Sequence, residues 1–229
     1  MNKKQVLPPP VQWERRVSFK NGIPWILRQK INIEGKKFVL INEISKIPIS
    51  ERKNYILLFY TNDKDFNAYY TDMSPKRLEI LQSFYAIISL DFSTYSSADY
   101  DDNKVAIKKN RRFCTFCQYH DILCIYNIVW ASNADYDLAF SHVEKGAVIA
   151  LSTYRISNHD DNLFRKGYLS IKRKIKPSII LCYGNPQVCM EKDIKSGLVV
   201  CIPTRFKILK QELFEKTGQC SFLNLLKIA

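Results

Sequence analysis

Residues 147–183 read AVIALSTYRISNHDDNLFRKGYLSIKRKIKPSIILCY, the hydrophobic pattern of a strand, a helix and a second strand. The apolar runs 147–151 and 178–183 have the length of strands and are apolar on both faces. Between them Asp161 can cap a helix, apolar residues follow at helical spacing, and Pro177 ends the pattern. The stretch predicts two buried parallel strands joined by a helical crossover.

The same alternation extends outward from this unit in both directions. Further apolar runs predict strands over residues 38–41, 55–60, 86–90, 124–130 and 198–202. Helical patterns follow Ser74-Pro75, cover about 103–119, run from Asp135 to Gly146, and follow Thr204. The sequence therefore predicts an α/β fold: a mostly parallel sheet of five or more strands with covering helices. It leaves open whether the sheet is open or rolled into a partial barrel. Residues 1–24 are expected to form an N-terminal arm, and 25–229 a single α/β domain.

The composition is that of a folded, basic protein. Of 229 residues, 46% are apolar and 25% charged, with only 7 glycines and a net charge of +13. Such a charge favours a polyanionic partner, nucleic acid or an acidic protein surface, although it could also serve only solubility. No run reaches the ~18 apolar residues of a membrane span, and no signal peptide precedes Pro8-Pro9-Pro10, so we expect a cytoplasmic protein without a membrane partner.

Polar residues follow each predicted strand, where ligands of parallel sheets bind. Asp91 is the strongest candidate, because a carboxylate directly after a buried strand needs a partner, a metal or a catalytic role. We therefore predict Asp91 and Ser93 as catalytic residues. The same polar residues also serve simply to turn the chain and cap helices. The predicted substrate-binding residues are Asp63, Trp130, Ser132, Ser152 and Tyr183.

Cys114, Cys117, His120 and Cys124 resemble a zinc motif but do not fit one. Their offsets place the first and last residues ~15 Å apart along a helix, so they are predicted to be a core-facing stripe, and no metal is expected. Neither a P-loop, a Gly-x-Ser-x-Gly elbow nor a Gly-x-Gly-x-x-Gly motif occurs, which disfavours the corresponding enzyme classes and leaves the cofactor unknown.

Two basic clusters lie on predicted helices and are candidate nucleic-acid contacts. Phosphate contacts of this kind give salt-dependent binding without sequence readout, whereas a solvated helix face would need no ligand. The candidate residues are Lys104, Lys108, Lys109, Arg111 and Arg112 in the first cluster, and Arg165, Lys166, Lys172, Arg173 and Lys174 in the second.

Four short motifs occur in a fixed order: DFSTY from 91, NIVW from 127, ALST from 150 and ILCYG from 180. Over about residues 20–205 the chain resembles an uncharacterised bacterial and phage family, a domain of unknown function found on prophages, plasmids and other mobile elements. Members often carry glycine where this chain has Tyr154-Arg155. The resemblance implies an α/β fold and a mobile-element origin, and it implies no established activity.

Three functional hypotheses follow. The first is a phage or mobile-element accessory protein that binds nucleic acid or a nucleoprotein through its basic helix faces. The second is an enzyme acting on a phosphorylated or nucleotide-like substrate at the carboxyl ends of the strands, with Asp91 as acid, base or metal ligand. The third is an inhibitor of a host defence or replication protein. The sequence does not indicate the oligomeric state.

Overall fold

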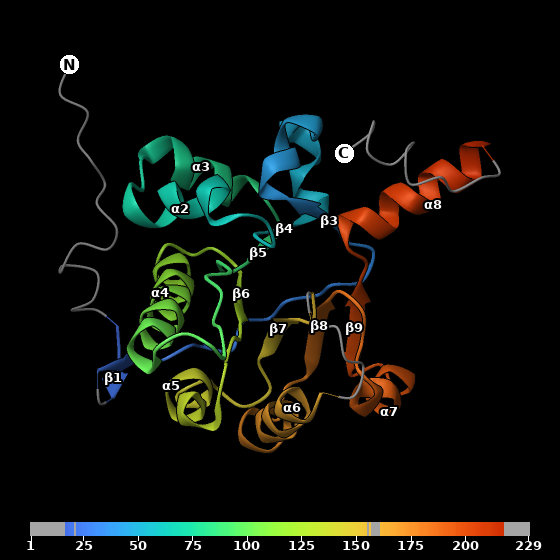
Figure 1. Cartoon of the computed structure of the whole chain (residues 1–229). Helices are drawn as coiled ribbons and strands as arrows, with labels where there is room; N and C mark the ends of the chain where they lie inside the picture. The colour runs from blue at the N-terminus through green and yellow to red at the C-terminus, as the bar shows by residue number, and fades with distance from the viewer. Residues whose placement is uncertain (1–16, 21, 155, 157–160, 218–229) are drawn as a thin grey trace.

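A computed structural model describes residues 17–20, 22–154, 156 and 161–217 of the chain. Its main sheet has seven strands, all parallel, and their order in space is their order in the sequence (Figure 1). The strands are β3 (Lys37–Leu40), β4 (Tyr55–Leu58), β5 (Ala86–Ile88), β6 (Cys124–Asn127), β7 (Val148–Ser152), β8 (Ile179–Tyr183) and β9 (Val199–Ile202). The predicted α/β fold with a parallel sheet of five or more strands is confirmed.

The sheet is a curled half-barrel, the helices that connect its strands lie around the convex outside, and α8 (Arg205–Thr217) extends away from the end of β9 (Figure 1). In sequential strand order every right-handed crossover returns on the same side, so one face of the sheet receives all the helices that connect two strands. The α-helices are α2 (Asp63–Thr71), α3 (Pro75–Ser83), α4 (Tyr100–Tyr119), α5 (Tyr136–Phe140), α6 (Asn162–Ile175), α7 (Glu191–Lys195) and α8 (Arg205–Thr217). Short 3₁₀ helices are η1 (Ile41–Lys46), η2 (Ile49–Asn54), η3 (Asn133–Asp135) and η4 (Val188–Met190).

Two contacts measure how strongly the sheet curls. The ring of Tyr60, just after β4, stacks on that of Tyr183 in β8 with centroids 4.4 Å apart. In a flat sheet strands four places apart lie roughly 19 Å apart. Glu43 comes just after the edge strand β3, and Arg205 comes just after the other edge strand, β9. The Arg205 guanidinium pairs with the Glu43 carboxylate at 2.8 Å. The carboxyl ends of the edge strands therefore approach each other, although β3 and β9 do not pair.

Both faces of the sheet are buried, which explains the continuous apolar runs. Successive strand residues point to opposite faces. Accordingly Leu57 and Phe59 pack in the core beneath the helices, whereas Ile56, Leu58 and Tyr60 pack in the core enclosed by the curl. A strand that is buried on both faces has no alternation of polar and apolar residues. The sequence of such a strand therefore does not indicate that the sheet is curled.

The segment before β3 crosses the amino-terminal end of the curled sheet. Ile31 and Ile33 pack against the enclosed core. The backbone N–H of Asn32 donates to Tyr85 Oη over 2.9 Å, and Cys124 N–H donates to Gln29 Oε1 over 2.8 Å. The concave core is thus covered at the end opposite to the predicted ligand site.

Several element boundaries differ from the predictions. The helix α2 was not expected, and the helix predicted from Asp135 to Gly146 is instead η3 followed by the short α5. The caps Ser74, Asp161 and Thr204 are confirmed, because each side chain accepts a hydrogen bond from the helix that it precedes. Most of the predicted arm 1–24 lies outside the described residues, and its last part forms a hairpin of β1 (Phe19–Lys20) and β2 (Ile23–Pro24).

Candidate functional site

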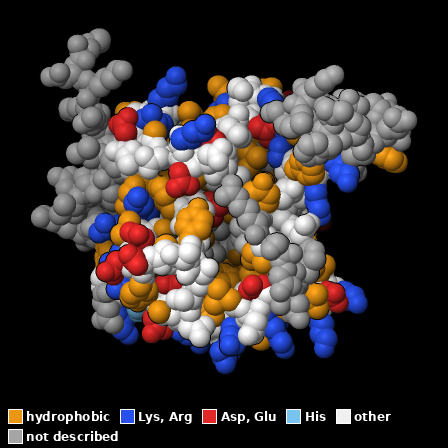
Figure 2. All heavy atoms as spheres, viewed as in Figure 1, with side chains coloured by type: hydrophobic (Ala, Val, Ile, Leu, Met, Phe, Trp, Pro, Cys, Tyr) orange, Lys and Arg blue, Asp and Glu red, His pale blue; other side chains and the backbone are white. Residues whose placement is uncertain are grey.

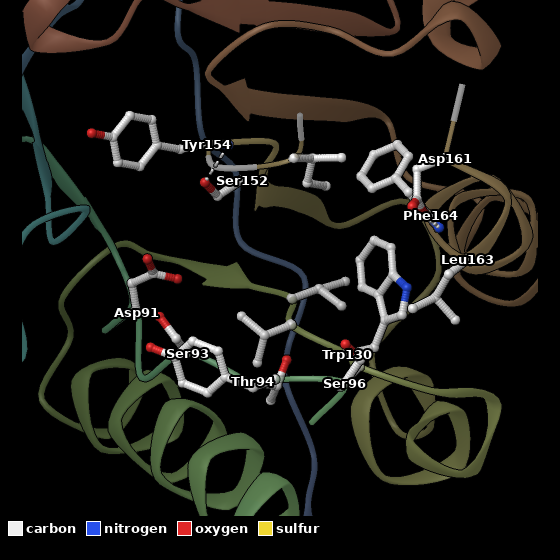
Figure 3. A pocket seen from close by; sticks show the side chains of 15 residues that line it. Asp91, Ser93, Thr94, Ser96, Trp130, Ser152, Tyr154, Asp161, Leu163 and Phe164 are labelled. Carbon is white, nitrogen blue, oxygen red and sulfur yellow. Dashed lines mark hydrogen bonds between the residues drawn. The ribbon is translucent and has the colours of Figure 1, made fainter. Parts of the chain in front are cut away.

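A cavity of about 410 Å³ opens at the carboxyl edge of the sheet, beyond β5, β6 and β7 (Figure 3). The segments that follow these strands form its walls together with the start of α6. Because parallel strands end at the same edge, side chains far apart in the sequence converge there. Four predicted site residues line this one cavity: Asp91, Ser93, Trp130 and Ser152.

A chain of hydrogen bonds from the enclosed core orients Asp91. Tyr60 Oη donates to Asn127 Oδ1 over 3.0 Å, and Asn127 Nδ2 donates to Asp91 Oδ1 over 2.8 Å. The same amide group donates to the Leu90 carbonyl, and the Asn127 N–H donates to Ser89 Oγ. Burial, and then the charge of Asp91, raise the pKa of Tyr60, so its hydroxyl stays protonated and remains a donor.

Two asparagines of α4 hold the loop that carries the predicted catalytic residues. Asn110 receives the N–H of Phe92 on its Oδ1 and donates its Nδ2 to the Phe92 carbonyl, both over 3.0 Å. Asn103 makes the same pair of bonds with the backbone of Tyr95, both over 2.9 Å. The loop 91–96 is thereby fixed to a long helix at two points, which gives Ser93 a defined place in the cavity wall.

Sequence reasoning did not select these three asparagines, although each left a signal. Asn127 interrupts the apolar run 124–130, and a buried amide must find hydrogen-bond partners. Asn103 and Asn110 are two helical turns apart and so share a face of α4. The partners of all three lie in other segments, which a local pattern cannot identify.

Replacing Tyr60 by phenylalanine should lower the free energy of unfolding by about 1–3 kcal/mol, because Asn127 Oδ1 would lose its donor in a buried site. Urea unfolding measures the change. Tyr95→Phe is the matched control, since Tyr95 is 55% exposed and its side chain should contribute no more than about 0.5 kcal/mol. Equal stabilities of the two variants would contradict a structural role for the bond between Tyr60 and Asn127.

A glycine of α6 provides the space in which Trp130 lies. The indole ring packs at 5.5 Å from the Phe164 ring and 5.7 Å from the Phe140 ring, measured between centroids. A Cβ atom on Gly167 would lie 2.3 Å from Trp130 Nε1, closer than any real contact. Glycine inside a helix costs about 1 kcal/mol relative to alanine. Here it allows the half-buried Trp130 to lie against the helix and form one wall of the cavity.

The other three predicted binding residues lie outside the cavity lining. Tyr183 stacks on Tyr60 in the enclosed core, and burial raises the pKa of its hydroxyl. Ser132 forms a capping box with Asp135 at the start of η3. Asp63 lies exposed in the first turn of α2. None of these three residues is among the described residues that line the cavity with Asp91.

Residues 9–202 match the family described as a domain of unknown function, DUF4417. The chain belongs to this family. The resemblance seen in the sequence to an uncharacterised phage-associated family is therefore confirmed.

Two curated relatives of this DUF4417 protein come from phages. It is 26% identical to the Gene 1 protein of Mycobacterium phage L5 over 141 residues, which are 60% of this chain and 61% of the relative. It is also 26% identical to the Gene 1 protein of Mycobacterium phage D29 over 141 residues, 60% of this chain and 52% of the relative. The match thus spans between half and two thirds of these relatives. No solved structure matches significantly.

The first basic cluster of this DUF4417 protein does not form one exposed surface. Arg111 is fully buried, so its prediction as a nucleic-acid contact is wrong. Its guanidinium donates to the carbonyls of Pro24, Leu138, Ala139 and Ser141. The other members remain nearer the surface: Lys104 pairs with Asp101, Lys109 lies 4.6 Å from the Phe92 ring centroid, Lys108 is exposed, and Arg112 is half-buried.

The second cluster divides into paired and exposed members. Lys172 binds the carboxylate of Asp193 with both oxygens at 2.7 Å, and Lys174 pairs with Asp137 at 2.9 Å. Arg165, Lys166 and Arg173 are exposed on α6, and Lys176, a further basic residue directly after the helix, is exposed as well. The exposed part of this cluster therefore begins directly after the α6 residues that line the cavity.

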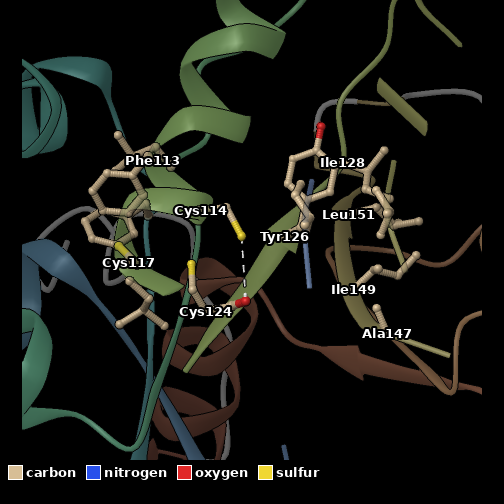
Figure 4. Close-up of a cluster of buried hydrophobic side chains, with 14 of the residues drawn as sticks. Phe113, Cys114, Cys117, Cys124, Tyr126, Ile128, Ala147, Ile149 and Leu151 are labelled. Atoms are coloured by element: carbon tan, nitrogen blue, oxygen red, sulfur yellow. Dashed lines mark hydrogen bonds between the residues drawn. The ribbon is translucent and has the colours of Figure 1, made fainter. Parts of the chain in front are cut away.

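The cysteine stripe packs in the core between α4 and β6 (Figure 4). Cys114, Cys117 and Cys124 are buried, and burial raises the pKa of each thiol. The prediction of a core-facing stripe is confirmed for these three cysteines, whereas His120, directly after α4, is only half-buried. Across the residues that the structure describes, no group of three or more metal-ligating side chains converges. The helices in the same part of the chain include none suited to crossing a membrane.

Proposed function

We propose that this protein belongs to a phage or other mobile element and binds a nucleoside-like ligand in the strand-end cavity. The convergence of Asp91, Ser93, Ser152 and Trp130 on one cavity of about 410 Å³ carries the proposal. That volume lies in the range of small-molecule sites. The half-buried indole offers a face for a planar base, while carboxylate and hydroxyl groups suit sugar hydroxyls and base amino groups. The phage origin rests on the two relatives.

The described part of the cavity lining favours a nucleoside over a phosphate group. It includes the carboxylates of Asp91 and Asp161, and among the described lining residues there is no Lys or Arg. A phosphate placed between carboxylates would be repelled. If the site also catalyses a reaction, Asp91 is the group placed to accept a proton from the ligand, and Asn127 holds its carboxylate in position.

Calorimetric titration with the four ribonucleosides and the four deoxyribonucleosides tests the proposal. We expect at least one to bind, and Asp91→Asn to weaken it about 10- to 100-fold, since hydrogen bonds to charged groups contribute about 1.5–3 kcal/mol. Asp63→Asn is the matched control, because Asp63 lies at the same edge of the sheet but outside the cavity. Absence of binding at millimolar concentration, or equal loss in both variants, would reject the proposal.

Binding of nucleic acid through a basic helix face is the second candidate function. The observation that favours it is the exposure of Arg165, Lys166, Arg173 and Lys176 on one side of the molecule. Filter binding of DNA and RNA at about 50 and 200 mM salt tests it, because phosphate contacts weaken steeply as salt rises. Retention that does not respond to salt would exclude this function.

A further inference from the structure

The helix α6 joins the cavity to the exposed basic residues. Leu163 and Phe164, in its first turn, line the cavity, and Arg165 and Lys166 follow directly and are exposed. Figure 2 shows Lys and Arg side chains along the edge of the molecule formed by α6 and α7. A ligand that leaves the cavity over α6 therefore meets positive charge within one helical turn.

The positive charge of α6 is one-sided and extends beyond its first turn. The helix sequence NLFRKGYLSIKRKI contains no Asp or Glu. Asp193 and Asp137, from other segments, pair with Lys172 and Lys174. The exposed Arg173 lies roughly 12 Å along the helix from Arg165. This spacing suits several successive phosphates of an extended polyanion better than one small anion.

The cavity and the basic face thus differ in chemistry, and a single ligand can satisfy both. The cavity has an aromatic wall with carboxylates, and the adjoining helix surface has guanidinium and ammonium groups. We infer that the ligand is a single-stranded nucleic acid, with one unpaired nucleoside in the cavity and the adjoining phosphates along α6. This inference rests on the proposed nucleoside site and extends it to the rest of the strand.

The recessed position of the cavity favours single-stranded over double-stranded nucleic acid. A base inside a duplex is stacked and paired, so it cannot enter a cavity unless it is flipped out of the duplex. In a single strand the base is free to stack on an aromatic side chain such as Trp130, a contact typically contributing about 1–3 kcal/mol per base. An acidic peptide would satisfy the basic face but would have no planar base for the cavity.

The test compares nucleosides with homopolymeric hexanucleotides of the same base, in DNA and in RNA, using the full chain. We expect the best hexanucleotide to bind about tenfold or more tightly than its nucleoside at about 50 mM salt, because it adds phosphate contacts. The double variant Arg165→Gln/Lys166→Gln should remove most of this advantage while leaving nucleoside affinity unchanged. Its salt slope should fall by about 1.4, since each single-strand phosphate contact contributes about 0.7.

The matched control is Lys64→Gln/Lys76→Gln, which removes two exposed positive charges on α2 and α3. It should leave both affinities unchanged. Equal affinity for nucleoside and hexanucleotide would overturn the inference while sparing the nucleoside site. Equal loss in the two double variants would also overturn it, because only net charge would matter. Hexanucleotide binding that Asp91→Asn does not weaken, or that poly-glutamate displaces as well as nucleic acid does, would place the strand outside the cavity and overturn the inference too.

Discussion

Replacing Arg111 by methionine should lower the free energy of unfolding by about 3 kcal/mol, the largest stability effect that we expect from a single substitution. The Arg111 side chain is fully buried and donates to four backbone carbonyls. The carbonyls of Ala139 and Ser141 belong to the end of α5, where a helix leaves its last acceptors unsatisfied. The Pro24 carbonyl belongs to β2. One guanidinium thus ties a helix end and the chain before the sheet to α4.

Methionine keeps most of the side-chain volume but donates no hydrogen bond, so the carbonyls would remain buried without partners. For a chain of this size the expected loss corresponds to a fall of roughly 6–12 °C in Tm. Lys108→Met is the matched control: the same helix, the same replacement and an exposed side chain, with an expected change within about 0.5 kcal/mol. Thermal unfolding of both variants measures the difference, and similar Tm values would contradict the assigned role of Arg111.

The burial of Arg111 shows what a local charge pattern misses. Arg111 lies in the stretch Lys108-Lys109-Asn110-Arg111-Arg112, so the charges of its neighbours in the sequence predict a basic surface cluster. Helical spacing gives the opposite answer: Arg111 lies four residues after Ile107 and three before Cys114, on the stripe correctly predicted to face the core. Periodicity outweighs charge here because buried carbonyls of two other segments accept four hydrogen bonds from the Arg111 guanidinium. Those carbonyls are invisible in the sequence around α4.

The fold itself was readable because each strand is a continuous apolar run bounded by capping and turn residues. The runs 55–60 and 124–130 contain β4 and β6, and the run 147–151 covers all of β7 except its last residue, Ser152. The curl was not readable, since a strand buried on both faces has the same sequence in a flat sheet covered twice and in a half-barrel. The stack of Tyr60 on Tyr183 is what reveals it, and these residues come from different parts of the chain.

The candidate site, like the fold, could be predicted from the sequence only in part. Asp91, Ser93, Trp130 and Ser152 could be predicted because ligands bind beyond the carboxyl ends of parallel strands. The residues that position them act through contacts between distant segments: Asn127 on Asp91, Asn110 on the loop after it, and Gly167 on Trp130. General rules of the fold therefore located the cavity, and only the structure identified its supports.

Gly167→Ala should weaken nucleoside binding about tenfold or more, since a displaced Trp130 would no longer offer its face to a base. At an ordinary helix position the change from glycine to alanine would raise stability by about 1 kcal/mol. Here the added Cβ would lie 2.3 Å from Trp130 Nε1, so the indole must move. We expect the resulting overpacking to lower the free energy of unfolding by about 1–3 kcal/mol. Leu169→Ala, at a residue 48% exposed on the same helix, should change binding little.

A double-mutant cycle separates displacement of Trp130 from a general weakening of α6. Leucine at position 130 is smaller than tryptophan and leaves room for the alanine methyl group. If that methyl group acts through the indole, Gly167→Ala in the Trp130→Leu protein should therefore lower the free energy of unfolding only slightly, or raise it. The two losses of stability would then be clearly less than additive. The indole N–H resonance of Trp130 should shift in the Gly167→Ala protein and stay in place in Leu169→Ala. Additive stability losses with an unmoved resonance would mean that Gly167 does not determine where Trp130 lies, and the cavity wall would need another explanation.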